Sequence, residues 1–161
     1  MAIPKKIFQT YSSLAALHSD IRKNIEKIQE NHPDWEYTFF SESDVADFIS
    51  DNYGDYFLEM YQRIDPGYGG TRADLFRYLL LFKIGGVYLD VKSGLVKNLN
   101  QIIKSEDTFL LSHWGPDYKG WGQYPELEGK PEFQNWFIIS VPEHPFLGAT
   151  IGDVIENIER Y

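Results

Sequence analysis

The sequence contains no cysteine, so disulfide bonds and metal sites built from thiolates are excluded. It has no apolar run near the roughly 20 residues that a membrane-spanning helix needs, and no signal peptide is visible. Basic residues are scarce, with 15 Lys and Arg against 24 Asp and Glu, which gives a net charge of −9. Non-specific nucleic-acid binding requires a basic face. We therefore expect no membrane span, no nucleic-acid partner and a cytoplasmic location.

Several common catalytic signatures are also missing. The chain has no phosphate-binding P-loop, no Gly-x-Gly-x-x-Gly fingerprint and no Ser-His-Asp grouping. His32, His113 and His144 are scattered without the spacing of metal ligands, and the position of His144 before Pro145 indicates a structural role. A few local cations can still hold a diphosphate, so the acidic charge does not exclude a nucleotide ligand.

The composition is that of a globular protein, with 43% hydrophobic and 16% aromatic residues. A length of 161 residues is typical of one domain, so we expect a single domain over 1–161. The aromatic residues exceed what a minimal core requires, and some of them are expected to line a ligand cleft.

Apolar spacing divides the chain into alternating strands and helices. Strands are predicted at 3–11, 35–40, 87–89, 108–113 and 135–141, and helices around 21–28, 45–49, 56–64, 71–84 and 145–160. Ser41 is a candidate N-terminal cap, and Gly85 suits the C-terminal cap of the helix 71–84. The alternation predicts an α/β fold with a mostly parallel sheet, in which ligands gather at the carboxyl ends of strands. Asp90 follows the strand 87–89 and should lie at that edge.

Two of the charged residues in the apolar helix 71–84 form a candidate pair. Asp74 and Arg77 are three residues apart and therefore share one face of the helix. On a half-exposed helix they would form an ordinary ion pair without a function. The flanking residues are apolar on several faces, so charged side chains here must face a cleft or carry a burial cost. We favour the cleft.

Asp90 also has two interpretations. Aspartate often ends a strand by starting an Asx turn, and for an isolated aspartate that is the simpler interpretation. The segment 85–89 before it, and the arginine-bearing helix before that segment, favour a functional role instead.

The blocks 3–11, 31–37, 73–90 and 135–146 resemble, in order, sequence blocks of family 32 glycosyltransferases, which carry an Asp-x-Asp signature. A lone Asp-x-Asp would be a weak signal, whereas four blocks in order over nearly the whole chain are a strong one. The resemblance implies a GT-A-like, Rossmann-type fold. It also implies transfer of a sugar from a nucleoside-diphosphate-sugar donor, with retention of anomeric configuration, to a glycan, lipid-linked or protein acceptor.

The same resemblance assigns roles to residues of this chain. Asp90, Arg77 and Asp74 form the expected catalytic group, and Asp90 is the expected contact to a divalent cation, Mn²⁺ or Mg²⁺. The expected donor-binding residues are Gln9, Thr10, Tyr11, Arg72, Asp74, Arg77, Gly86, Tyr88, Asp90, Lys92 and Asn135. Asp74, Arg77 and Asn135 would surround the donor sugar, and Arg72 could face the diphosphate.

Lys92 departs from the family pattern because it stands where the second aspartate of the signature belongs. Hard cations require oxygen ligands, and an ammonium group repels them. Three accounts remain open on the sequence. Lys92, together with Arg72, could replace part of the metal's charge; a metal could be held through Asp90 and another carboxylate; or the chain could be an inactive relative.

The acceptor side is less defined. Trp121 and Tyr124, in the Gly/aromatic stretch 114–124, are candidates for stacking on an acceptor sugar. The Gly-Pro-containing segment that usually follows in the family has no match here, which suggests a minimal or C-terminally truncated domain.

Two other functions compete with sugar transfer. One is a non-catalytic module that binds a nucleotide-sugar or carbohydrate at a degenerate metal site. The other is a nucleotide-sugar hydrolase or glycosidase built on paired acids. Glu126, Glu128 and Glu132 could supply such acids, although a solvated acidic loop explains them more simply.

Overall fold

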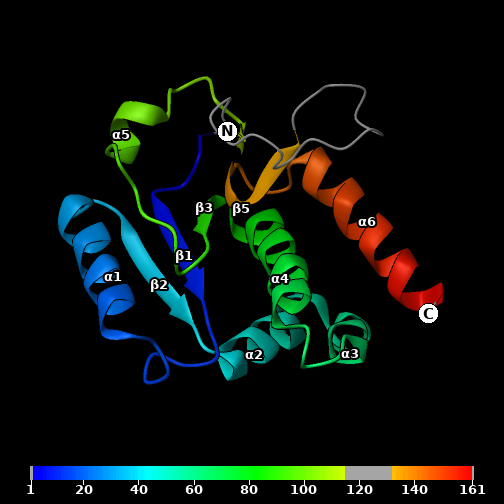
Figure 1. The fold of residues 1–161 in the computed structure, drawn as a ribbon. Coiled ribbons are helices and arrows are strands. Elements are labelled where there is room, and N and C mark those ends of the chain that lie inside the picture. Colours follow the sequence, from blue (N-terminus) through cyan, green and yellow to red (C-terminus); the bar gives the residue numbers. More distant parts are fainter. Residues whose placement is uncertain (1, 115–131, 161) are drawn as a thin grey trace.

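The computed structural model describes residues 2–114 and 132–160, which Figure 1 shows as a ribbon. Within these residues, five strands form one sheet in the order β2-β1-β3-β5-β4. Their bounds are β1 (Lys6–Thr10), β2 (Glu36–Phe40), β3 (Gly86–Leu89), β4 (Phe109–His113) and β5 (Phe133–Ser140). β1 pairs in parallel with β2 and β3, while β5 is antiparallel to β3 and β4. All strands except β5 therefore run in one direction, which confirms the predicted α/β fold.

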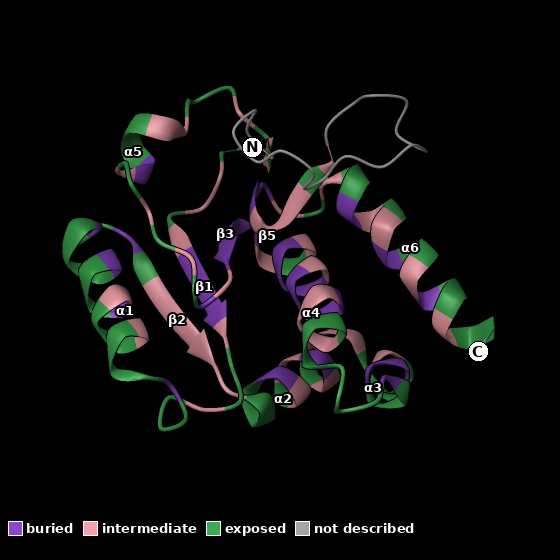
Figure 2. Cartoon of the chain, viewed as in Figure 1, coloured by how far each residue is buried: buried purple, intermediate pink, exposed green. Residues whose placement is uncertain are grey.

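Helices cover both faces of this sheet (Figure 1). α1 (Ser19–Asn31) and α5 (Leu99–Ile102) pack on one face, and α2 (Glu42–Tyr53), α3 (Asp55–Arg63), α4 (Gly69–Ile84) and α6 (Pro145–Arg160) pack on the other. Alternate residues of a strand point to opposite faces of the sheet. Ile7 and Val87 therefore pack in the core beneath α1 and α5, and Phe8 and Tyr88 pack in the core on the other face. Figure 2 shows the buried residues concentrated in β1, β3 and α4.

The local signals of the helix ends agree with the sequence. Ser41 precedes α2 and forms a capping box with Asp44, in which each residue bonds the other's backbone N–H. No helix in the described ranges is long and apolar enough to cross a bilayer. α5 was not predicted, because four residues are too few to show a helical repeat.

Two of the histidines hold elements together. The ring of His144 stacks on Phe109 at 4.5 Å, and its Nδ1 accepts a bond of 3.3 Å from the N–H of Phe146 at the start of α6. Buried His32 lies 2.8 Å from the carbonyl of Ile28 through Nδ1 and accepts the N–H of Leu99 at 3.0 Å through Nε2. These contacts support the structural role expected for His144.

Gly85 and Gly86 reverse the chain between α4 and β3, and this reversal brings Asp90 back to α4. Their φ angles are +69° and +109°, values that favour glycine. The N–H of Gly85 bonds the carbonyl of Leu81 at 2.8 Å, which closes α4 as predicted. A Cβ on Gly86 would lie 2.8 Å from the backbone oxygen of Lys6, so a side chain there would push β1 away from β3.

We expect Gly86→Ala to lower the free energy of unfolding by about 2–4 kcal/mol, because it adds backbone strain and a clash with a strand. Gly152→Ala is the matched control, since Gly152 lies inside α6 and an added Cβ there meets nothing within 4 Å. The control should be neutral or stabilise by about 0.5–1 kcal/mol. Urea unfolding of both variants measures the difference, and equal stability would contradict the strained turn.

Candidate functional site

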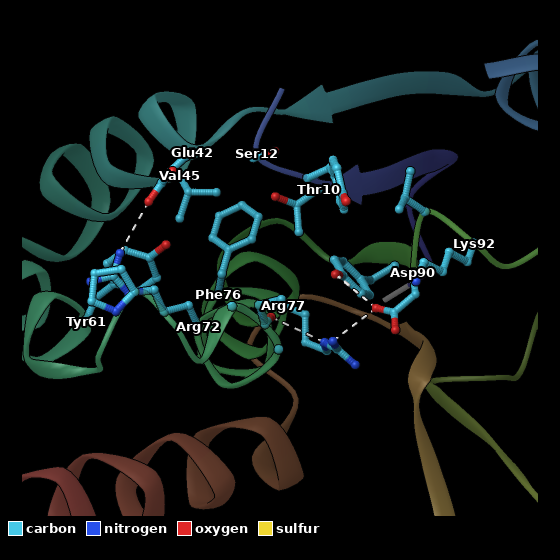
Figure 3. A pocket seen from close by; sticks show the side chains of 17 residues that line it. Thr10, Ser12, Glu42, Val45, Tyr61, Arg72, Phe76, Arg77, Asp90 and Lys92 are labelled. Atoms are coloured by element: carbon cyan, nitrogen blue, oxygen red, sulfur yellow. Dashed lines mark hydrogen bonds and ion pairs between the residues drawn. The ribbon is translucent and has the colours of Figure 1, made fainter. Parts of the chain in front are cut away.

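A pocket of about 520 Å³ lies where the carboxyl ends of β1 and β3 meet the N-terminal half of α4. Figure 3 shows the side chains around it. Its described lining combines apolar groups, hydroxyls and charges: Thr10, Tyr11, Ser12, Glu42, Val45, Tyr61, Pro66, Gly69, Gly70, Arg72, Ala73, Phe76, Arg77, Tyr88, Asp90, Val91 and Lys92. This is the edge of the sheet at which the sequence placed a ligand.

Arg77 is the centre of the site and is only 3% exposed. Its Nη2 lies 2.9 Å from Asp74 Oδ1 and 3.0 Å from Asp90 Oδ1, so one nitrogen holds both carboxylates. Its Nη1 donates to the backbone oxygen of Asn135 at 2.5 Å. The guanidinium carbon lies 4.7 Å from the centre of the Tyr88 ring, at cation–π distance. A buried charge requires such partners, and this one connects α4, β3 and β5.

Asp74 is half-buried beside Arg77. Burial raises the pKa of its carboxyl above the ordinary value, against the opposing effect of the Arg77 charge, and the charge of Asp90 raises it further. The side chain of Asn135 donates to Asp74 Oδ1 at 3.1 Å and reaches the Tyr78 hydroxyl at 3.4 Å. The ionised carboxylate of Asp74 is thus held at a cost to folding, as charged groups often are at functional sites.

The ring of Tyr88 packs against the guanidinium of Arg77, and its hydroxyl donates a hydrogen bond to Asp90 Oδ1 at 3.3 Å. Burial raises the pKa of Tyr88 well above its ordinary value, so this hydroxyl stays a donor at any physiological pH. Asp90 Oδ1 therefore receives bonds from two side chains.

The turn that carries Asp90 and Lys92 is fixed on several sides. The N–H of Ser93 bonds the Asp90 carbonyl at 2.7 Å and closes the turn. Gln9 donates to the same carbonyl at 3.2 Å. Between the two charged residues, Val91 is buried against α1. The Asx-turn interpretation of Asp90 is not what the structure has, because its carboxylate bonds Arg77 while its backbone makes the turn.

Arg72 lies at the other end of the pocket from Lys92 (Figure 3). Its Nε donates to the Ile64 carbonyl at 2.9 Å, its Nη1 lies 3.3 Å from Glu42 Oε1, and its guanidinium carbon lies 5.1 Å from the Tyr61 ring centre. Glu42 and Tyr61 belong to α2 and α3 and carried no sequence signal of a role in the site. The structure thus separates Arg72 from Lys92, which the sequence had grouped at the diphosphate.

Most of the predicted donor residues come together at the pocket. Thr10, Tyr11, Arg72, Arg77, Tyr88, Asp90 and Lys92 line it, and Asp74 and Asn135 contact Arg77 beside it. Two predicted residues lie behind the lining instead. Buried Gln9 bonds the Asp90 carbonyl and accepts the Tyr37 hydroxyl at 2.9 Å, and Gly86 packs against β1. Trp121 and Tyr124, the acceptor candidates, lie outside the described residues, as do Glu126 and Glu128.

The described side chains around the pocket do not fit a divalent cation. Across residues 2–114 and 132–160, no group of three His, Asp or Glu side chains is placed to hold a metal ion. The Oδ1 atoms of Asp74 and Asp90 both contact the same nitrogen of Arg77, so a cationic group already lies between these two carboxylates. At a phosphate site such a cation is usually held by one or two carboxylates. Here the Asp90 carboxylate bonds Arg77, and two residues on stands the ammonium group of Lys92, which repels a cation, in place of a second carboxylate.

The chain is similar to several known proteins. The family model "Glycosyltransferase sugar-binding region containing DXD motif" matches residues 18–109. Inositol phosphoceramide mannosyltransferase 3 of Schizosaccharomyces pombe is 33% identical over 63% of this chain and 28% of its own length. Mannosyl phosphorylinositol ceramide synthase CSH1 of Saccharomyces cerevisiae is 31% identical over 99% of this chain and 36% of its own length.

The fold has a counterpart among solved structures. The PaToxG glycosyltransferase superposes with a TM-score of 0.72 over 99% of this chain and 62% of that protein, at 16% identity. This chain therefore spans only about a third of the two yeast proteins and less than two thirds of the PaToxG chain. The family match covers more than half of the chain and includes α4, β3 and Asp90. The chain belongs to glycosyltransferase family 32, whose sugar-binding region contains the DXD motif.

Proposed function

We propose that this protein transfers a sugar from a nucleoside-diphosphate-sugar to a hydroxyl acceptor, with the donor in the pocket beside α4. The arrangement of Asp74, Arg77 and Asp90 carries the proposal. One buried guanidinium holds the Oδ1 atom of both carboxylates, whereas neither Oδ2 atom has a hydrogen-bond partner among the described residues. Carboxylate oxygens held in this way are suited to accept hydrogen bonds from sugar hydroxyls.

The rest of the pocket supports a donor of this class. A volume of about 520 Å³ falls within the range of small-molecule sites. Tyr11, which is exposed, offers an aromatic surface that suits a nucleoside, and the Asp90 carboxylate lies at the end nearer Lys92. A ligand that has both a flat ring and a polyhydroxyl group matches this combination of lining groups.

The names of the relatives suggest which substrates to test first. Both yeast relatives are named for the transfer of mannose to a phosphoinositol ceramide. We therefore propose a hexose donor, with mannose tested first. A glycan, a lipid-linked group and a protein all remain candidates for the acceptor.

We further propose that transfer retains the anomeric configuration by attack on the same face that the diphosphate leaves. The bond between sugar C1 and the diphosphate oxygen breaks, a bond forms between C1 and the acceptor oxygen, and the acceptor proton passes to the leaving diphosphate. Asp74 and Asp90 are both paired with Arg77, which makes either a poor nucleophile and favours a mechanism without a glycosyl-enzyme intermediate.

A second candidate function is a binding module without catalysis. The lack of a carboxylate cluster for a metal in the described residues favours it. The two functions differ in one property, because an enzyme of this class hydrolyses its donor slowly when no acceptor is present and a pure binder does not.

The first test is donor hydrolysis. We expect GDP or UDP to be released slowly from one of the common GDP- and UDP-hexoses, and Asp90→Asn to slow this release about a hundredfold or more, since it removes a fixed charge at the reacting sugar. Asp153→Asn is the control because Asp153 lies exposed on α6. Binding of a donor without any release would favour the binding module, and equal rates in the Asp90 variant and the wild type would contradict the proposed site.

The second test separates function from stability at Asp74. Its pKa is raised in the folded protein, so its contribution to stability is present below its ordinary pKa of 3.8 and is lost as the pH rises through the folded-state value. Asp74→Asn removes the ionisable group and with it this loss of stability at higher pH. Arg77 keeps Asp90 and the Asn135 carbonyl as partners in this variant. We therefore expect it to be as stable as the wild type or more stable at pH 7, with the difference vanishing below pH 3.8, although its donor hydrolysis falls.

Urea unfolding between pH 3.5 and 7.5, together with the hydrolysis assay, measures both effects. A variant that is clearly less stable than the wild type at pH 7 would show that the ion pair with Arg77 stabilises the fold, and Asp74 would then be a structural residue.

A further inference from the structure

This site carries a positive side chain, that of Lys92, where the family motif has a negative one. The description of the family names a DXD motif, and the segment of this chain that resembles the motif is Asp90-Val91-Lys92. The side chains around it do not fit a divalent cation, as described above. A departing diphosphate still requires neutralisation of its developing negative charge. Some other positive group at this end of the pocket must therefore supply it.

The described lining of the pocket holds three cations, Arg72, Arg77 and Lys92. Arg77 already pairs with two carboxylates, and its 3% exposure leaves little surface for a ligand. Arg72 pairs with Glu42 and lies at the opposite end of the pocket. Lys92 is exposed and forms no hydrogen bond or ion pair with any described residue. It is the one lining cation in this part of the chain whose charge no carboxylate takes up.

The position of Lys92 is set by the backbone although its side chain is free. It follows buried Val91 in the turn that the Ser93 N–H closes on the Asp90 carbonyl. Asn24 of α1 donates to the Ser93 carbonyl at 2.7 Å, and Gln9 of β1 donates to the Asp90 carbonyl. The stem of Lys92 therefore starts from a fixed point two residues after Asp90. A lysine so placed can meet a phosphate as a flexible point charge.

On the basis of the function proposed above, we propose that Lys92 binds the donor diphosphate and takes the charge role that a divalent cation has at a DXD motif, so that donor binding requires no metal. Asp90 keeps its contact to the sugar through its free Oδ2, while the ammonium group of Lys92 contacts the phosphate oxygens. The carboxylate and the ammonium are separated by one buried residue, so the turn presents one charge to each part of the donor.

The proposal is tested by titration calorimetry with GDP and UDP, each in EDTA and in Mn²⁺, and with guanosine and uridine as probes that lack phosphate. Lys92→Ala removes the charge, and Lys92→Asp restores the family motif. Lys83→Ala is the matched control, because Lys83 is exposed in the last turn of α4 and does not line the pocket. Thermal unfolding of each variant checks that it is folded.

We expect the wild type to bind one nucleotide equally in EDTA and in Mn²⁺, and this binding to weaken with added salt. Lys92→Ala should weaken it about tenfold to a hundredfold, as for loss of a hydrogen bond to a charged group, with no change in nucleoside binding. Lys92→Asp should bind the nucleotide in Mn²⁺ but not in EDTA, and Lys83→Ala should match the wild type.

Wild-type binding that appears only with Mn²⁺ would overturn the role of Lys92 while leaving the proposed function intact. So would a Lys92→Ala variant that binds nucleotide as the wild type does. Absence of nucleotide binding by the folded wild type, with and without Mn²⁺, would instead overturn the proposed function and this inference with it.

Discussion

The buried guanidinium of Arg77 is the interaction on which the site depends. A cation that is 3% exposed would be strongly unfavourable without partners, and α4, β3 and β5 each supply one. The same contacts fix the Oδ1 atoms of Asp74 and Asp90, whose side chains stay 39% and 42% exposed. Burial of the arginine and partial exposure of the carboxylates therefore have one cause. The fold hides the positive charge and presents the negative ones to a ligand.

Much of the fold could be predicted because its signals are local. Apolar periodicity, the cap at Ser41 and the glycines after α4 placed most helices and strands close to their observed bounds. The order of the strands could not be predicted in this way. β5 is inserted, reversed, between β3 and β4, and its register depends on contacts such as Tyr88 with Ile138 that lie far apart in the sequence.

In the site, too, the features that depend on local sequence spacing could be predicted, and the contacts between distant segments could not. The spacing of Asp74 and Arg77 placed them on one helical face, and the end of a strand located Asp90. The actual meeting of Arg77 with Asp90 depends on the Gly85–Gly86 reversal, and no spacing rule states its geometry. Contacts made by backbone atoms, such as the Asn135 carbonyl with Arg77, leave no trace in residue type. For this reason the sequence also placed Gln9 in the pocket, where the structure has it holding the backbone of Asp90.

A lysine side chain and a bound metal ion can both supply positive charge at the pocket, but they require different surroundings. A metal ion brings two charges, but it requires oxygen ligands and is disfavoured beside a fixed cation. Here the charge between Asp74 and Asp90 is already supplied by Arg77. A second cation at Asp90 is therefore best carried on the chain itself, close to the carboxylate but separated from it by the buried Val91. In a protein with a net charge of −9, a free lysine at the pocket also favours the approach of an anionic ligand that the rest of the surface would repel. Lys92 thus offers a positive charge at this edge of the pocket that Arg77, already paired with both carboxylates, does not.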